Sequence, residues 1–165
     1  MDSKPSRTLR PITDEDRVFL KKVFDSAWQR ALAGSNWPPD VQQQVLAHQF
    51  EAQDSSYRKD YPDASYDVIE IDGTPAGRIY VDRRKDEICL MEMSLLPKYR
   101  NQKIGTALIE ELLEEAAKTG KTVVLHVEHW NPEARRLYER LGFEMEEDIG
   151  THWRMRWSPE SGSAS

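Results

Sequence analysis

A short basic loop, residues 97–103, lies between an apolar run and a helical pattern that opens at Ile104. A strand that leads into a helix leaves several backbone N–H groups without partners at the helix start, and the helix dipole adds to their positive potential. Arg100 and Lys103 bring further positive charge to the same place. The loop therefore predicts a site for an anion such as a phosphate group.

Two nucleotide-binding motifs do not fit this loop. A Walker motif requires two glycines and a Gly-Lys-Ser/Thr ending, and a Rossmann fingerprint requires three glycines. Gly105 is the only glycine in residues 97–106. The anion site is therefore of another kind.

Glu92 is a second candidate for chemistry, because it interrupts the apolar run from Ile88 to Leu96. A buried carboxylate is costly unless it is paired or functional. Glu92 is thus either a base that deprotonates an amine or one half of a salt bridge to a neighbouring strand or helix, and the sequence favours neither. Strand alternation places it on the face opposite Met93 and Leu95. The alternative bases are His126 and Glu128, at the end of the next apolar run.

The composition excludes several classes of protein. A length of 165 residues predicts a single domain, with an ordered core over about residues 8–157 and flexible ends at 1–7 and 158–165. The net charge of -6 argues against nucleic-acid and anionic membrane partners. No apolar run approaches the ~20 residues of a membrane span, and the N-terminus lacks the apolar core of a signal peptide. A cytoplasmic location is expected.

The single cysteine, Cys89, lies in an apolar run and predicts a buried core residue of a reducing compartment rather than a nucleophile. No group of His, Cys, Asp or Glu has the spacing of a metal site, so no metal is expected.

Hydrophobic periodicity and turn residues predict the order β-α-α-β-β-β-α-β-α-β-β. The strand–helix–strand unit around Ile104–Thr119 predicts a right-handed crossover with parallel strands, within a mixed, mostly antiparallel seven-stranded sheet with helices on both faces (α+β). The predicted strands are 8–12, 66–71, 77–81, 88–96, 122–127, 143–149 and 152–157, and the predicted helices are 14–33, 38–53, 104–119 and 132–141, with a connector over 57–63.

Two segments resemble signatures of the GNAT N-acetyltransferase superfamily. Arg100 and Gly105 fill the outer positions of its pyrophosphate loop, Arg/Gln-x-x-Gly-x-Gly/Ala, and Lys103 stands where the first glycine is usual. Residues 131–143 closely resemble Asn-x-x-Ala-x-x-Leu-Tyr-x-x-x-Gly-Phe. The resemblance covers about residues 86–157, and it implies the GNAT fold.

The resemblance also implies acetyl-CoA as co-substrate. The backbone at Met93 and Leu95 would pair with the pantetheine amides as an added strand does, and N–H groups of the loop would hold the pyrophosphate. Asn131 would bind the pantetheine arm, and Tyr138 would stand by the thioester sulfur. The implied cofactor-binding residues are Met93, Leu95, Arg100, Gln102, Lys103, Ile104, Gly105, Thr106, Asn131 and Tyr138.

The implied activity is direct transfer of an acetyl group to a primary amine, without a covalent enzyme intermediate. Tyr138 would protonate the leaving thiolate and Glu92 would serve as base. Simple core packing is the other interpretation of Tyr138. A non-catalytic acyl-CoA-binding or regulatory module of the same fold is the alternative function.

The acceptor, a small-molecule or peptide amine, is not identified by the sequence, and a homodimer stays open. Aromatic and histidine side chains in or just after the first two helices are expected to wall the acceptor site: Trp28, Trp37, His48, Phe50, Tyr57 and Tyr61. Core packing is the alternative for Trp28.

Overall fold

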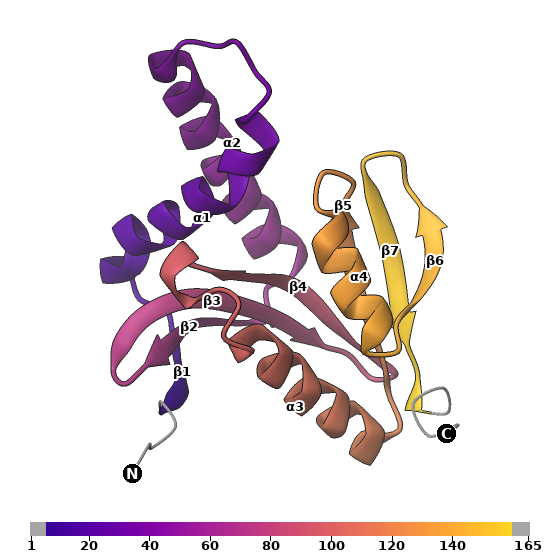
Figure 1. Cartoon of the computed structure of the whole chain (residues 1–165). Coiled ribbons are helices and arrows are strands. Elements are labelled where there is room, and N and C mark those ends of the chain that lie inside the picture. The colour runs from indigo at the N-terminus through magenta and orange to yellow at the C-terminus, as the bar shows by residue number, and fades with distance from the viewer. Residues whose placement is uncertain (1–5, 160–165) are drawn as a thin grey trace. The chain divides into compact units, whose positions relative to one another are not determined.

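The structure, a computed structural model, describes residues 6–159. Its strands are β1 (Arg7–Pro11), β2 (Ser65–Ile71), β3 (Thr74–Arg83), β4 (Glu87–Leu95), β5 (Thr122–Glu128), β6 (Glu144–Asp148) and β7 (His152–Trp157) (Figure 1). Its helices are α1 (Arg17–Leu32), α2 (Pro39–Asp60), α3 (Ile104–Thr119) and α4 (Pro132–Arg140), with 3-10 turns η1 (Asp14–Asp16) and η2 (Pro97–Tyr99).

The strands form a seven-stranded sheet in the order β1-β2-β3-β4-β5-β7-β6. Strands β1 and β2 pair antiparallel, as do β5 with β7 and β7 with β6. Strands β4 and β5 pair parallel, with Glu87–Leu90 against Thr122–Leu125. A mixed, mostly antiparallel sheet with one helical crossover is therefore confirmed.

The chain divides into two compact units, and β3 and β4 contribute residues to both. The first unit comprises the chain up to Tyr80 together with Glu92–Arg100, and the second comprises Val81–Met91 and the chain from Asn101 onward. The single-domain prediction stays a prediction.

The predicted flexible leader is shorter than expected. Arg7 begins β1, and the backbone N–H of Ser6 donates to Oδ1 of Asp72 over 2.8 Å. Strand β1 therefore begins one residue before its predicted start at residue 8. The rest of the predicted leader, residues 1–5, and most of the predicted tail, residues 160–165, lie outside the described residues.

In the first unit, α1 and α2 pack on each other through buried Leu20, Phe24, Leu46 and Phe50. Trp28 stacks on Phe24 with ring centroids 5.5 Å apart, so it belongs to this core, as the alternative interpretation held.

The predicted end of α2 was wrong. The helix runs to Asp60, seven residues past its predicted end at residue 53, because Tyr57 packs edge-on against Tyr80 at 6.0 Å and holds the extra turns on the sheet. His48 is exposed, whereas Leu46 and Phe50 are the buried residues of this helix, and the place of His48 in the acceptor wall stays a prediction.

In the second unit, α3 and α4 both pack on β5, whose Val123, Val124, Leu125 and Val127 are buried. The predicted apolar stripe of α3 is confirmed by the burial of Leu108, Ile109, Leu112 and Ala116. Cys89 is buried, and this burial raises the pKa of its thiol. No helix within residues 6–159 has both the length and the hydropathy that crossing a membrane requires.

Candidate active site

The predicted site residues fall in both units. Glu92, Met93, Leu95 and Arg100 belong to the first, whereas the loop residues from Gln102, together with Asn131 and Tyr138, belong to the second.

In the first unit, the C-terminal half of β4 lies unusually close to β3. A Cβ atom on Gly77 would sit 2.1 Å from the carbonyl oxygen of Ser94 and 3.0 Å from Cα of Leu95, which no side chain tolerates. The N–H of Leu96 donates to the carbonyl of Ala76 over 2.8 Å. Glycine at position 77 is thus what allows this approach.

Each oxygen of the Glu92 carboxylate has its own partner. The Ser94 hydroxyl donates to Oε1 over 2.7 Å, and Nη2 of Arg78 lies 3.6 Å from Oε2. The Glu92 side chain keeps 18% of its exposure, whereas that of Arg78 keeps 3%. The salt-bridge interpretation of Glu92 is therefore observed, and its role as a base stays a prediction.

Arg100 contacts its own unit. Its Nε donates to the carbonyl of Leu95 over 3.0 Å, and its Nη2 donates to the hydroxyl of Ser26 over 3.4 Å. The side chain therefore ties the turn after β4 to α1. A phosphate contact for Arg100 stays a prediction.

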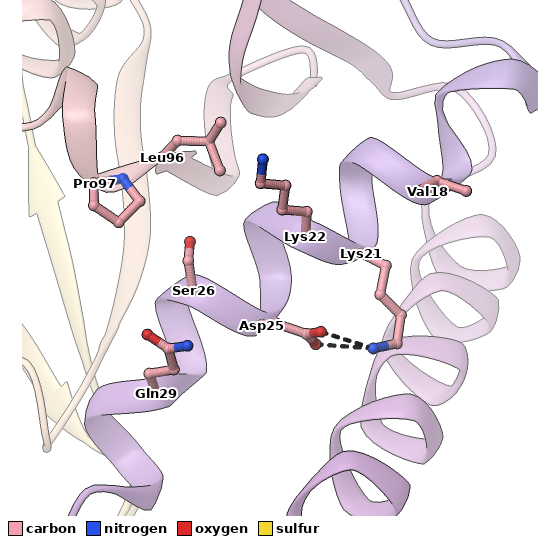
Figure 2. Close-up of a pocket in the computed structure, with 8 residues that line it drawn as sticks. All are labelled: Val18, Lys21, Lys22, Asp25, Ser26, Gln29, Leu96 and Pro97. Atoms are coloured by element: carbon pink, nitrogen blue, oxygen red, sulfur yellow. Dashed lines mark hydrogen bonds and ion pairs between the residues drawn. The ribbon is translucent and has the colours of Figure 1, made fainter.

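A groove of about 500 Å³ runs between α1 and the turn after β4 (Figure 2). In Figure 2, Lys21 is joined to Asp25, and Nζ of Lys21 lies 2.8 Å from that carboxylate. The groove is lined by Val18, Lys21, Lys22, Asp25, Ser26, Gln29, Leu96 and Pro97.

An arginine of the first unit covers one of the aromatic faces that were expected to bind an amine. The guanidinium carbon of Arg17 lies 5.3 Å from the Phe50 ring centroid. Trp37, in contrast, is 48% exposed. The predicted aromatic wall is thus partly internal packing.

In the second unit, the loop before α3 has a left-handed backbone. Lys103 is the N-cap of α3 with φ 64° and ψ 13°, and Asn101 has φ 61°. Left-handed φ is where glycine is favoured and where other residues lose about 1–2 kcal/mol. Lys103 therefore adopts the backbone conformation that glycine suits best, at the position where the GNAT loop usually has one.

The first turn of α3 offers N–H groups to a ligand. The first helical hydrogen bond runs from the N–H of Ala107 to the carbonyl of Lys103 over 3.0 Å. The N–H groups of Ile104, Gly105 and Thr106 therefore have no acceptor within the helix. N–H groups of this kind at the start of a helix are suited to bind an anion such as a pyrophosphate.

Both signature residues of α4 have a structural role. Oδ1 of Asn131 accepts from the N–H of Ala134 over 3.4 Å and caps the helix. Tyr138 is 9% exposed and packs edge-on against Phe143, with centroids 5.6 Å apart. The packing interpretation of Tyr138 is thus observed, and its acid role stays a prediction.

A titratable cluster lies on β5 and β7. His126 pairs with Arg154 in the β5–β7 register, and burial, followed by the charges of His152 and Arg154, lowers the pKa of His126. A neutral imidazole at pH 7 can accept a proton, which keeps His126 open as a base.

The sequence analysis missed two site residues, Gly77 and Arg78. Both residues lie in the predicted strand 77–81. A glycine within a strand indicates close backbone approach, and a charged residue within an apolar strand must be paired or functional. Within residues 6–159, no group of His, Cys, Asp or Glu is arranged to hold a metal ion.

A model of the acetyltransferase (GNAT) family matches residues 27–143, and the chain belongs to this family. The resemblance drawn from the two signatures is confirmed.

Two sequence relatives are N-acetyltransferases. An uncharacterized N-acetyltransferase of Methanocaldococcus jannaschii is 34% identical over 96 residues, which cover 53% of this chain and 42% of that protein. The ribosomal protein bS18-alanine N-acetyltransferase of Escherichia coli is 42% identical over 59 residues, which cover 35% of this chain and 40% of that protein. The alignments thus span less than half the length of these curated relatives.

Solved structures share the fold. The PaiA N-acetyltransferase of Thermoplasma acidophilum in complex with coenzyme A has a TM-score of 0.71 at 22% identity, covering 93% of this chain and 99% of that one. Naa50 of Arabidopsis thaliana in complex with the bisubstrate analogue CoA-Ac-MVNAL has a TM-score of 0.58 at 17% identity, with 93% and 99% covered. The predicted GNAT fold is confirmed.

Proposed function

We propose that this protein is an N-acetyltransferase that transfers the acetyl group of acetyl-CoA to a primary amine. The observation that carries the proposal is the start of α3, where the left-handed Lys103 aligns three N–H groups that have no helical acceptor. Family membership supports the same reading, since a structural relative was solved in complex with coenzyme A.

In this proposal, acetyl-CoA is held mainly by backbone groups. The N–H groups from Gln102 to Thr106 bind the pyrophosphate, and Met93 pairs with a pantetheine amide. At Leu95 the carbonyl already accepts from Arg100, so we assign the second pantetheine contact to the Leu95 N–H. Asn131 contacts the arm while it caps α4.

The reaction needs one acid and one base. The neutral amine attacks the thioester carbonyl carbon, and the tetrahedral oxyanion then collapses with cleavage of the C–S bond. The Tyr138 hydroxyl gives its proton to the leaving thiolate. The attacking nitrogen loses a proton to Glu92, directly or through water, and the products are the amide and free CoA.

His126 is the competing base, and paired variants separate the two. If Glu92 is the base, Glu92→Gln should lower the turnover number by about 10²–10⁴, whereas His126→Gln should leave it within about threefold. The reverse pattern would transfer the role to His126. Circular dichroism on both variants confirms that each is folded.

We further propose that the acceptor is the α-amine of a peptide or protein. Two relatives carry names that point to such acceptors, an alanine N-acetyltransferase of a ribosomal protein and Naa50 bound to a CoA-linked peptide. An α-amine of pKa about 7.7–8.0 is partly neutral at pH 7.5, whereas a lysine amine of pKa about 10.4 is almost fully charged. The α-amine therefore reacts at a smaller cost in deprotonation.

The test measures release of free CoA from acetyl-CoA with matched peptides. One peptide has a free N-terminus and no lysine, and its control has an acetylated N-terminus and one lysine. We expect kcat/KM to be at least about tenfold higher for the first peptide. If the enzyme prefers the lysine peptide or a polyamine, the proposed acceptor is that class of amine and not the α-amine. Tight binding of CoA in calorimetry, with no turnover on any amine, would instead support the acyl-CoA-binding module.

A further inference from the structure

The most deeply buried charge in the first unit is the guanidinium of Arg78 on β3. The residue is 2% exposed, and its Nε, also buried, has no hydrogen-bond partner. Its Nη2 donates to Oε1 of Gln53 on α2 over 3.0 Å, and its Nη1 donates to the Tyr80 hydroxyl over 3.4 Å. The guanidinium has five N–H donors, and only some of them have an acceptor.

Stability alone does not explain this arginine. Burial of a guanidinium acts to lower its pKa, but the charge of Glu92 and the Tyr80 side chain offset it, so the pKa of Arg78 is raised and the group stays charged. A buried ion pair is often no more stabilising than apolar residues of similar volume. The unpartnered Nε makes the site less favourable still. The buried charge of Arg78 is therefore better explained by a functional role than by stability.

Glu92 is the anion that Arg78 touches. The two carboxylate oxygens are held by different groups, Oε1 by the Ser94 hydroxyl at 2.7 Å and Oε2 by Nη2 of Arg78 at 3.6 Å. Two anchors on two oxygens prevent rotation of the carboxylate about its last bond. At 3.6 Å the arginine contact is a charge contact rather than a hydrogen bond, so lone pairs on Oε2 remain for another donor.

We propose that Arg78 is a positioning residue for acetyl transfer, which orients the Glu92 carboxylate to receive a hydrogen bond from the acceptor amine or its water. This inference rests on the proposed function. The 18% exposure of the Glu92 side chain gives such a donor access, while the buried arginine approaches from within the unit. Gln53 fixes the guanidinium in turn, so α2 sets the position of Glu92 through Arg78.

The test combines kinetics with unfolding. Arg78→Met keeps much of the side-chain volume and removes the charge, and we expect kcat/KM for the acceptor peptide to fall about 10–100-fold while KM for acetyl-CoA stays within about twofold. Arg78→Lys, which restores a cation, should recover at least part of that loss. Glu92→Gln should cost less in the Arg78→Met background than in the wild type, because the two residues act as a unit.

The matched control is the Arg10–Asp16 pair in the same unit, whose atoms lie 2.8 Å apart. Arg10→Met should lower the melting temperature and leave kcat within about twofold. A folded Arg78→Met enzyme with normal kcat/KM would overturn the proposal, even if its melting temperature fell as in the control. A rise in KM for acetyl-CoA as large as the fall in kcat/KM for the acceptor peptide would also indicate a merely structural role for Arg78.

An unfolding cycle keeps the inference separate from the proposed function. In urea, Arg78→Met and Glu92→Gln should be non-additive, with a coupling of at least about fivefold in the unfolding equilibrium constant. Additive effects would overturn the hold of Arg78 on Glu92 whatever the enzyme does. Absence of CoA release by the wild type with every amine would contradict the acetyltransferase function, whereas coupling in that case would still confirm the Arg78–Glu92 contact.

Discussion

The two units of this protein are specified in different ways. In the second, local signals determine the structure: an apolar stripe builds α3, and Asn131 caps α4. In the first, long-range contacts decide it: Arg78 reaches Glu92 and Gln53, and Gly77 admits Ser94. The signatures of the family lie where local signals dominate, whereas the proposed base lies where they do not. A motif can therefore locate the cofactor loop and still miss what positions the reacting carboxylate.

The largest effect is expected at Tyr138 in the second unit. Tyr138→Phe removes the hydroxyl and keeps the ring that packs on Phe143, so the fold should survive while turnover falls by about 10²–10⁴. The alkaline limb of the pH–rate profile should also disappear. Melting temperature and turnover measured on one preparation check this. A less stable enzyme with near-normal turnover would leave Tyr138 as packing only.

Gly77 tests the first unit in the same way. Gly77→Ala places a methyl group against the Ser94 carbonyl, which is backbone and cannot turn aside, so we expect a loss of about 3 kcal/mol in unfolding free energy. Gly34→Ala is the matched control, because nothing lies within 4 Å of a Cβ there. Urea unfolding of both variants measures the difference. Equal stabilities would show that β3 and β4 are not held as closely as described.

Acid should weaken the first unit through Asp16. Hydrogen bonds from Arg10 are the main reason why the pKa of Asp16 is lowered from 3.8 to about 2. The folded state therefore gains from the ionised carboxylate above about pH 4, and this gain, about 1–2 kcal/mol after allowance for solvent, is lost as the pH falls towards 2. The stability gap between wild type and Asp16→Asn should be full at pH 7 and should close near pH 2. A gap independent of pH would contradict the charge pairing.

The smallest effect is expected at Lys103. Lys103→Gly relieves a left-handed residue, and since glycine also loses more entropy on folding, the net gain should not exceed about 1 kcal/mol. Acetyl-CoA affinity should stay within about tenfold, because the N–H groups keep their positions. Calorimetry checks this, with Gly105→Glu as the control that should abolish binding through bulk and negative charge. A large loss of affinity in Lys103→Gly would assign the phosphate contact to the lysine side chain.

Local patterns in the sequence predict most of the elements and the cofactor loop. Gly120 ends α3, proline at the first position begins α4, and a continuous apolar run predicts β5, because such features act within a few residues of themselves. The end of α2 was misjudged, since Tyr57 is kept helical by Tyr80, more than twenty residues away.

The sequence by itself therefore determined the family, the strands of the sheet and the position of the loop before α3. Only the tertiary structure decided that Glu92 is held by Arg78, that Arg100 caps the turn after β4, and that Lys103 has a left-handed backbone. Periodicity records which face of an element is apolar, but it carries no information on which buried charge meets which. That choice depends on distances between residues far apart in the chain, and those exist only once the strands are paired.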